Sequence, residues 1–317
     1  MISSALSKNE LLRDRSSMLK TARQFFYSKN ILEVDCPAIT QGASVDSHID
    51  LIKVSSQNLK WRYLHSSPEY GMKRLIADGI GDIYQLSHVF RDGESSTKHN
   101  PEFMMAEWYR MDFSFEMMIQ ETIDFISLFL GKLPFRVMSY GQVFREYAGI
   151  DYFQASIDEL LNYLTSNDVT PYPGVESEGK DAVLNLILGS LIEPKLGDNE
   201  LFVLAYYPAS QAALAKTRKL DGELVAERFE VYYRGIELAN GYHELTDAVE
   251  QRARFLESNQ FRSQLGKEQL PIDEYFLHAL QKGFPDCSGV AVGFDRLMML
   301  RHDCDIEKVI PFTWDKA

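Results

Sequence analysis

One segment constrains the fold of this chain more than any other, because residues 82–111 hold two apolar stretches around a polar, turn-rich insert. Residues 82–90 alternate in polarity like a half-buried strand, and residues 102–111 are apolar and aromatic enough for a central strand. The insert would place Arg91 at the end of the first strand and Phe103 in the next. The segment therefore predicts an antiparallel hairpin.

Arg91 and Phe103 are residue types that suit a nucleotide. A guanidinium group offers a planar fork for phosphate oxygens, and a phenyl ring offers a flat face for a purine. The ordinary alternative is a surface hairpin with a salt-bridged arginine, which is the commoner use of such a turn. The hairpin alone leaves both interpretations open.

The composition limits the kind of protein and its partners. A chain of 317 residues with 45% hydrophobic content can bury a large core. Its net charge of −13 has the wrong sign for a protein that binds a nucleic-acid backbone, so we expect no extensive tRNA or DNA contact.

The cysteines and the termini point to the cytoplasm. Cys36, Cys287 and Cys304 are odd in number and lack CxxC spacing, which is typical of free thiols in a reducing compartment. The sequence shows no signal-peptide pattern and no run of about 18 apolar residues. We therefore expect a cytoplasmic protein without a membrane contact.

The order of the expected elements indicates an α+β fold. Ser7 and Glu10 form a capping box for a long amphipathic helix. Residues 48–54 and 59–65 alternate as short strands, and residues 151–200 read as helices and loops inserted on the sheet. Strands grouped in this way predict an antiparallel sheet flanked by helices rather than repeated βαβ units.

Two glutamates in a strand-rich region are candidate metal ligands. A hairpin turn at Arg234-Gly235 would place Glu237 opposite Tyr232, which makes Glu237 and Glu230 diagonal neighbours on one face, about 7–8 Å apart. Mg²⁺ ions that keep several waters and bridge phosphates suit two carboxylates at this separation. The alternative is a pair of solvated glutamates on a surface ribbon.

A third glutamate, Glu244, follows Glu237 at the same spacing of seven residues. Side chains of a straight strand alternate between faces, so Glu244 would point away from the other two. It joins their face only if Asn240-Gly241 forms a bulge.

The segment Gly293-Phe294-Asp295-Arg296 lies where a strand gives way to a helix. Arg296 there is placed to hold the far end of a triphosphate, and an ordinary Asp-Arg pair at a helix start is the alternative. His99 and His243 fit hydrogen-bonding neighbours better than metal ligands, because no second ligand stands at helical or strand spacing. Without a GxxxxGK[ST] loop, a nucleotide site must use arginines and Mg²⁺.

Taken in order, these pieces resemble the catalytic domain of the class II aminoacyl-tRNA synthetases, in particular the lysyl branch. The helix and strand ending at Pro37, the hairpin 90–103 and the segment 293–296 are similar to motifs 1, 2 and 3 of that family. Blocks similar to its lysine-specific signatures are residues 67–75, 99–103 and 237–245. The resemblance covers about residues 8–302 and implies one catalytic domain over residues 1–317, with the insertion at about 151–200, and a homodimer.

Departures from lysyl-tRNA synthetases narrow the resemblance. We expect no N-terminal anticodon-binding domain, because the part similar to motif 1 starts close to residue 1, and Ala291 stands where those enzymes have glycine. With residues 207–215, these features resemble the bacterial elongation factor P lysine ligases, a family of truncated paralogues. That family activates (R)-β-lysine with ATP and transfers it to a lysine of elongation factor P rather than to tRNA. Gly93 stands where the family has a glutamate, and Glu94 would supply the missing carboxylate. Asp92 stands where the family has an asparagine.

The resemblance also implies a role for individual residues. Arg91 would hold the α-phosphate, Phe103 would stack on the adenine and Arg296 would hold the γ-phosphate, so the two arginines are the catalytic residues. Glu69 would bind the substrate ammonium near the carboxylate, while Tyr109 and Glu244 bind the terminal one. The remaining implied ATP contacts are Asp92, Gly93, Asn100, Glu237, Leu238 and Gly293; the remaining substrate contacts are Ser67, Pro68, Asn240 and Ala291; and the Mg²⁺ ligands are Glu230 and Glu237.

Two other functions stay open at this point. One is a stand-alone enzyme that forms lysyl-adenylate and acts on tRNA or a small amine. The other is a non-catalytic sensor of lysine and ATP. A sensor tends to lose its catalytic arginines and metal carboxylates, whereas Arg91, Arg296, Glu230 and Glu237 are all present.

Overall fold

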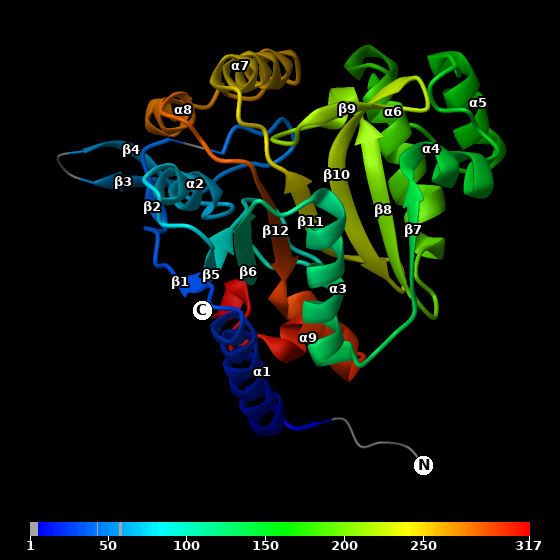
Figure 1. Cartoon of the computed structure of the whole chain (residues 1–317). Coiled ribbons are helices and arrows are strands. Elements are labelled where there is room, and N and C mark those ends of the chain that lie inside the picture. The colour runs from blue at the N-terminus through cyan, green and yellow to red at the C-terminus, as the bar shows by residue number, and fades with distance from the viewer. Residues whose placement is uncertain (1–5, 43, 57–58) are drawn as a thin grey trace. The chain divides into compact units, whose positions relative to one another are not determined.

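The computed structural model describes residues 6–42, 44–56 and 59–317. The chain divides into two compact units, the first made of Met1–Lys132 and Glu244–Ala317 and the second of Leu133–His243 (Figure 1). The expectation of a single catalytic domain without an anticodon-binding domain stays a prediction.

The first unit contains a set of helices around a central sheet and a smaller three-stranded sheet. Its elements are α1 (Lys8–Ser28), β1 (Leu32–Glu33), β2 (Ile39–Thr40), β3 (Lys53–Ser56), β4 (Leu59–Leu64), α2 (Glu69–Ala77), β5 (Ile83–Phe90), β6 (Glu102–Met111), α3 (Phe115–Leu130), α7 (Ala248–Gln264), α8 (Glu274–Gln281), β12 (Cys287–Gly293), α9 (Phe294–His302) and α10 (Ile306–Val309).

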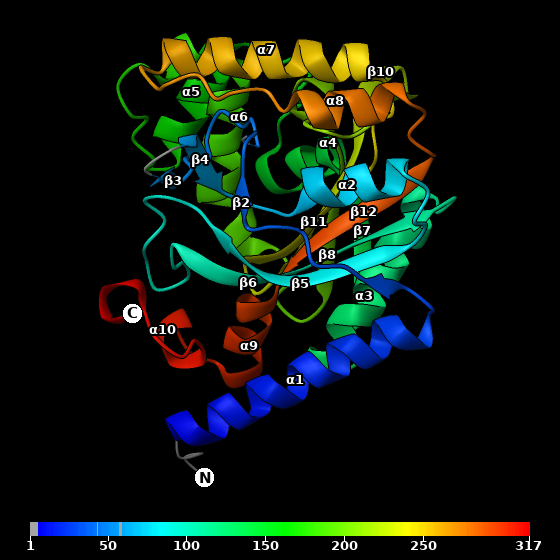
Figure 2. The same ribbon diagram turned by 90° about the vertical axis from the view of Figure 1, so that its left-hand side faces the viewer.

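The central strands of this unit follow the order β1-β5-β6-β12. Only β1 and β5 run parallel, and β5, β6 and β12 are antiparallel neighbours. Phe90 lies opposite Glu102, so the predicted hairpin across residues 82–111 is confirmed. Figure 2 shows α1 and α9 on one side of β5 and β6, with α2 and α8 on the other. The sheet is thus covered by helices on both faces.

Helix α1 begins as predicted, because Ser7 and Glu10 form a complete capping box. Its buried face packs through Phe26, whose ring stacks on Tyr84 at 4.1 Å between centroids and lies 5.3 Å from Trp108. Within the described residues, none of the helices combines the length and the apolar character that crossing a bilayer requires.

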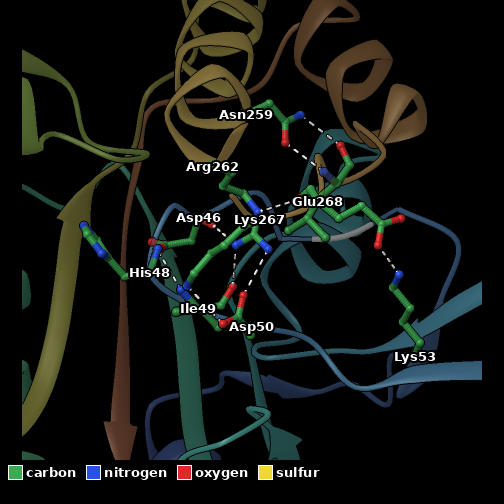
Figure 3. Close-up of polar contacts among 10 residues, drawn as sticks. Asp46, His48, Ile49, Asp50, Lys53, Asn259, Arg262, Lys267 and Glu268 are labelled. Atoms are coloured by element: carbon green, nitrogen blue, oxygen red, sulfur yellow. Dashed lines mark hydrogen bonds and ion pairs between the residues drawn. The ribbon is translucent and has the colours of Figure 1, made fainter. Parts of the chain in front are cut away.

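The prediction of a strand over residues 48–54 is wrong for most of that segment, because β3 begins only at Lys53. Alternating polarity suggested a strand, but the backbone carbonyls of Asp46 and Ile49 accept hydrogen bonds from the Arg262 guanidinium instead of from a neighbouring strand (Figure 3). The turn at residues 57 and 58 lies outside the described residues.

The second unit contains a mostly antiparallel sheet and the helices that cover it. Its elements are β7 (Phe135–Ser139), α4 (Tyr140–Val143) with a π-helical turn at Phe144–Ala148, α5 (Ile157–Ser166), α6 (Lys180–Ile187) with a π-helical turn at Leu188–Ile192, β8 (Leu201–Pro208), β9 (Thr217–Leu220), β10 (Glu223–Tyr233) and β11 (Ile236–His243).

Strand β10 is central in this second unit, with β11, β8 and β9 as antiparallel partners, and β7 runs parallel to β8. The core of the second unit is apolar and aromatic. Tyr140 stacks on Phe144 at 4.5 Å and lies 5.2 Å from Tyr207. Both units therefore have the α+β character expected from the sequence.

Candidate active site

The hairpin β5–β6 brings Arg91 and Phe103 together. The backbone N–H of Arg91 donates to the Pro101 carbonyl at 2.9 Å, which continues the strand pairing one residue past β5. The Arg91 guanidinium lies 5.2 Å from the centroid of the Phe103 ring, within the range of a cation–π contact. The structure thus places a guanidinium group beside an aromatic ring, and their roles in holding a phosphate and an adenine stay predictions.

Arg296 lies in the first turn of α9 and donates to Nε2 of His99 at 2.7 Å. Burial and the positive charge of Arg296 lower the pKa of His99, so its ring stays neutral and accepts this hydrogen bond at physiological pH. His99 is thus a hydrogen-bonding neighbour, as expected, and it orients Arg296.

The start of α9 is also fixed by Asp295, which is buried. One of its oxygens accepts from the Arg15 guanidinium of α1, and the other accepts from the backbone N–H of Met104 at 2.8 Å. Helix α1, strand β6 and Arg296 are therefore connected through one carboxylate.

The loop after Arg91 turns at Gly93, which has a φ of +76°. This left-handed backbone conformation favours glycine, which accounts for the departure from the family glutamate. Glu94 lies close to Arg91, with Oε1 3.8 Å from the guanidinium. The carboxylate that Gly93 lacks is therefore available one residue later.

Asn100 is buried at the other end of this loop, with 7% of its surface exposed. Its Nδ2 donates to the Glu102 carbonyl at 2.7 Å, and its Oδ1 accepts from the backbone N–H of Trp314 at 3.0 Å. Thr97 also accepts, through its carbonyl, from the Ile306 backbone at 3.0 Å. Asn100 thus holds the loop against the C-terminal segment, and its contact with ATP stays a prediction.

Arg262 of α7 contacts the segment 46–50 (Figure 3). This segment lies against the loop at residues 91–100, called the nucleotide loop below. Arg262 donates to the carbonyls of Asp46 and Ile49 and to the Asp50 carboxylate at 2.9–3.0 Å. The Asp50 carbonyl in turn accepts from the backbone N–H of Asp92 at 2.8 Å. Segment 46–50 therefore links α7 to the residue that follows Arg91.

A second group of polar side chains surrounds Glu107, which sequence reasoning missed. Ser67 Oγ donates to one Glu107 oxygen at 2.6 Å, and the Tyr109 hydroxyl donates to the other at 2.7 Å. Burial and the nearby Glu69 charge raise the pKa of Glu107 to about 8. The sequence contains one sign that could have identified Glu107, because its carboxylate lies within a mostly apolar strand.

Ser67 and Pro68 lead into α2, which begins at Glu69, one residue later than a Ser67 cap predicts. Ser67 Oγ still accepts from the backbone N–H of Glu69 at 3.0 Å. The first turn of α2 is thereby fixed to Glu107, and Glu69 lies beside it.

Lys73, one turn further along α2, was also missed by sequence reasoning. Its side chain is 1% exposed, and Nζ lies 2.7 Å from a Glu69 oxygen and 2.6 Å from a Glu244 oxygen. Burial opposes its charge, but the carboxylates of Glu244 and Glu69 outweigh this and raise the pKa of Lys73. One fixed ammonium group therefore lies among three acidic side chains: Glu69, Glu107 and Glu244.

Strand β12 lies beside these groups, paired with β6. Gly289 lies opposite Tyr109, and Ala291 lies opposite Glu107, so both positions face the same side of the sheet. A Cβ atom at Gly289 would lie 2.3 Å from Tyr109 Cε1 and 2.5 Å from Glu244 Oε1. Only glycine fits there, whereas the methyl group of Ala291 is accommodated.

Glu230, Glu237, Leu238 and Asn240 belong to the second unit. Glu237 lies opposite Tyr232, as the predicted turn requires, and Asn240 lies opposite Glu230. The condition for Glu244 to join their face, a bulge at Asn240-Gly241, is not met, because the register shifts between Glu237 and Ala239 and leaves Leu238 as the extra residue. The bulge at Leu238 still places Glu237 and Asn240 on one face.

Glu230 does not fit a metal ligand as it is arranged. It is buried and accepts hydrogen bonds from Tyr207, Tyr232 and Arg228. Glu237 is half-buried. Across residues 6–42, 44–56 and 59–317, no three His, Cys, Asp or Glu side chains are grouped to hold an ion. Mg²⁺ would therefore depend on Glu237 and on substrate phosphates, which is a common arrangement for this ion.

Comparison with known proteins gives matches over nearly the whole chain. The sequence profile of the family described as tRNA synthetases class II (D, K and N) matches residues 4–316. A relative from Histophilus somni (strain 2336) is 43% identical over 309 residues, which cover 96% of this chain and 94% of the relative. One from Haemophilus influenzae (strain Rd) is 41% identical over 320 residues, or 99% and 97% of the two chains. Both are named elongation factor P–(R)-β-lysine ligase.

Proposed function

Because this chain belongs to the class II tRNA synthetase family (D, K and N), we propose that it is an ATP-dependent ligase of the kind named for its relatives. It activates (R)-β-lysine as an aminoacyl-adenylate and transfers it to the ε-amino group of a lysine on elongation factor P. ATP is the co-substrate.

The charge balance of the side chains around Lys73 carries this proposal. Their carboxyl groups are those of Glu69, Glu107 and Glu244, but the raised pKa of Glu107 keeps that group protonated at neutral pH, so two carboxylates surround the one ammonium group of Lys73. A diamino acid carries two ammonium groups and one carboxylate, so its single net positive charge balances the negative charge that remains. The arrangement therefore suits a diamino acid.

In the first step, the substrate carboxylate attacks the α-phosphorus of ATP in line with the departing pyrophosphate. The new bond joins a carboxylate oxygen to the α-phosphorus. The bond between the α-phosphorus and the oxygen that bridges it to the β-phosphorus breaks. Arg91 stabilises the charge that develops on the α-phosphate, and Arg296, oriented by His99, holds the far phosphate. The reaction requires no protein nucleophile.

Mg²⁺ would supply further charge neutralisation, and the family resemblance implies Glu237 as a residue that would hold it. In the second step, the acceptor amine attacks the carbonyl carbon of the adenylate, and AMP leaves. The amine reacts in its neutral form, although a free lysine has a pKa of about 10.4.

We also propose a homodimer formed through α1 and the strand that follows it. Tyr27 and Leu32 are apolar side chains with 85% and 55% of their surfaces exposed, which supports a partner on this face. Sedimentation of the purified protein would test the oligomeric state.

The function is tested by ATP–pyrophosphate exchange with (R)-β-lysine and α-lysine side by side, followed by transfer to purified elongation factor P. We expect exchange that prefers the β-isomer and label on the factor. Exchange with neither amino acid would support a sensor of lysine and ATP instead. Exchange without transfer would show that another amine or tRNA is the acceptor.

A further inference from the structure

Lys73 is a buried charged residue to which the reaction above gives no role. Its ammonium group makes ion pairs with Glu69 on its own helix and with Glu244 on the segment before α7. The rings of Tyr109 and Phe276 each lie 5.8 Å from Nζ. Lys73 is therefore enclosed by α2, β6, α8 and Glu244.

The two carboxylates that Lys73 joins are those proposed to bind the two amines of the substrate. Because both contact the same nitrogen, the two oxygens are held within two hydrogen-bond lengths of each other. An ionised carboxylate has about four acceptor positions, so the contact with Lys73 uses only part of the capacity of each carboxylate. Without Lys73, two buried like charges would repel each other or take up a proton.

We propose that Lys73 sets the distance between the two ammonium acceptors, Glu69 and Glu244, and thereby selects the amine-to-amine separation of the substrate. Lys73 is thus a positioning residue that acts through the two glutamates. This inference rests on the proposed function, because it requires a diamino acid in the pocket.

Three diamino acids allow the effect of the spacing between the amines to be distinguished from the effect of the carboxylate position. The two amines of β-lysine are one carbon closer together than those of α-lysine. Ornithine has the same amine separation as β-lysine, but its carboxylate is attached to the amine-bearing carbon, as in α-lysine. Comparing the three amino acids separates amine spacing from carboxylate position.

The experiment measures kcat/KM for ATP–pyrophosphate exchange with each amino acid in the wild type, Lys73→Met and Lys73→Arg. Lys73→Met removes the common cation. Lys73→Arg keeps the charge but spreads the donors over a wider fork. Lys282→Met is the matched control, since Lys282 is an exposed lysine at the end of α8, the helix that also contributes Phe276 beside Lys73.

We expect the ratio of kcat/KM for β-lysine over α-lysine to fall by at least about tenfold in Lys73→Met, which is the scale at which a pocket discriminates a single methylene. The ratio for ornithine over α-lysine should fall with it, and the KM for ATP should change little. Lys73→Arg should shift both ratios towards the longer α-lysine, and Lys282→Met should keep the wild-type ratios.

Wild-type ratios in both Lys73 variants would overturn the inference and leave the proposed function intact. If Lys73→Met does not fold, as shown by its thermal transition, Lys73→Arg decides alone, because it retains a cation in the pocket. A wild type that gives no exchange with any of the three amino acids would overturn the proposed function and the inference with it.

Discussion

At the scale of single residues, we expect Ala291 and Glu107 to limit the room for the amino-acid substrate proposed above. The two lie directly opposite each other on β12 and β6, so the methyl group of Ala291 faces the side on which Glu107 lies. Ala291→Gly removes that methyl group, and we expect kcat/KM for α-lysine to rise about tenfold relative to β-lysine. Exchange assays with both amino acids check this, and an unchanged preference would show that Ala291 does not restrict the pocket.

Glu107 also makes the stability of the protein depend on pH. Its pKa of about 8 lies above that of an exposed glutamate, so between these values the folded state binds a proton that the unfolded state has lost. The free energy of unfolding should therefore fall as pH rises from about 5 to 8, by up to about 1.4 kcal/mol per pH unit from this group.

Glu107→Gln has no carboxyl group to titrate, so its stability should decline less over the same pH range. Urea unfolding of both proteins at several pH values measures the difference. Parallel curves for the two proteins would contradict the assigned protonation of Glu107.

Sequence reasoning reached Glu69, Tyr109 and Glu244 only through the family resemblance, and it missed Lys73 and Glu107. A lysine in an amphipathic helix reads as solvated, and only the tertiary structure shows that Lys73 is buried between two carboxylates. Glu107 carried a weak signal, because a carboxylate in an apolar strand is costly unless it is paired.

At the scale of elements, local patterns predicted hairpins well and irregular loops poorly. The hairpin β5–β6 and the turn that places Glu237 opposite Tyr232 follow from alternation and turn residues close in sequence. The loop at residues 46–50 depends on Arg262, more than two hundred residues away, which no local pattern reveals.

Arg262→Ala should loosen this loop and, through Asp50 and Asp92, the nucleotide loop beyond it. The Arg262 side chain is 4% exposed and makes an ion pair with Asp50. We expect a loss of about 3 kcal/mol in the free energy of unfolding, since the variant loses the hydrogen bonds that the buried guanidinium donates to Asp46, Ile49 and Asp50. The KM for ATP should rise several-fold while that for the amino acid changes less.

Arg252→Ala is the matched control for Arg262→Ala. Arg252 lies on the same helix and makes an exposed ion pair with Glu274, which should contribute little to stability. Chemical denaturation and pyrophosphate exchange compare the two variants. Equal effects from both would show that the Arg262 contacts do not support the nucleotide loop.

At the scale of the whole molecule, the net charge of −13 limits the choice of acceptor. A polyanion such as tRNA is repelled by a protein of the same sign unless basic side chains gather on one surface. We predict no tRNA binding at about 0.15 M salt. Charge interactions at this concentration act over a range of about 8 Å, so only basic side chains close to the phosphates could attract the tRNA. Filter binding with labelled tRNA checks this, and saturable binding or tRNA aminoacylation would favour the alternative acceptor.

The α+β class followed from the order of elements in the sequence, but the order of strands within each sheet did not. Strand β12 pairs with β6 although more than 170 residues separate them in the chain. Such pairing depends on side chains that meet only after folding, of which Gly289 against Tyr109 is an example.

Gly289 and Ala291 differ sharply in how far evolution can change them. Any side chain at Gly289 collides with Tyr109 and Glu244, so we expect selection to remove amino-acid replacements at this position wherever the activity is kept. Ala291, two residues further along the same face, already carries a methyl group. On this strand, we therefore expect a new substrate preference to arise more readily by a mutation at Ala291 than by one at Gly289.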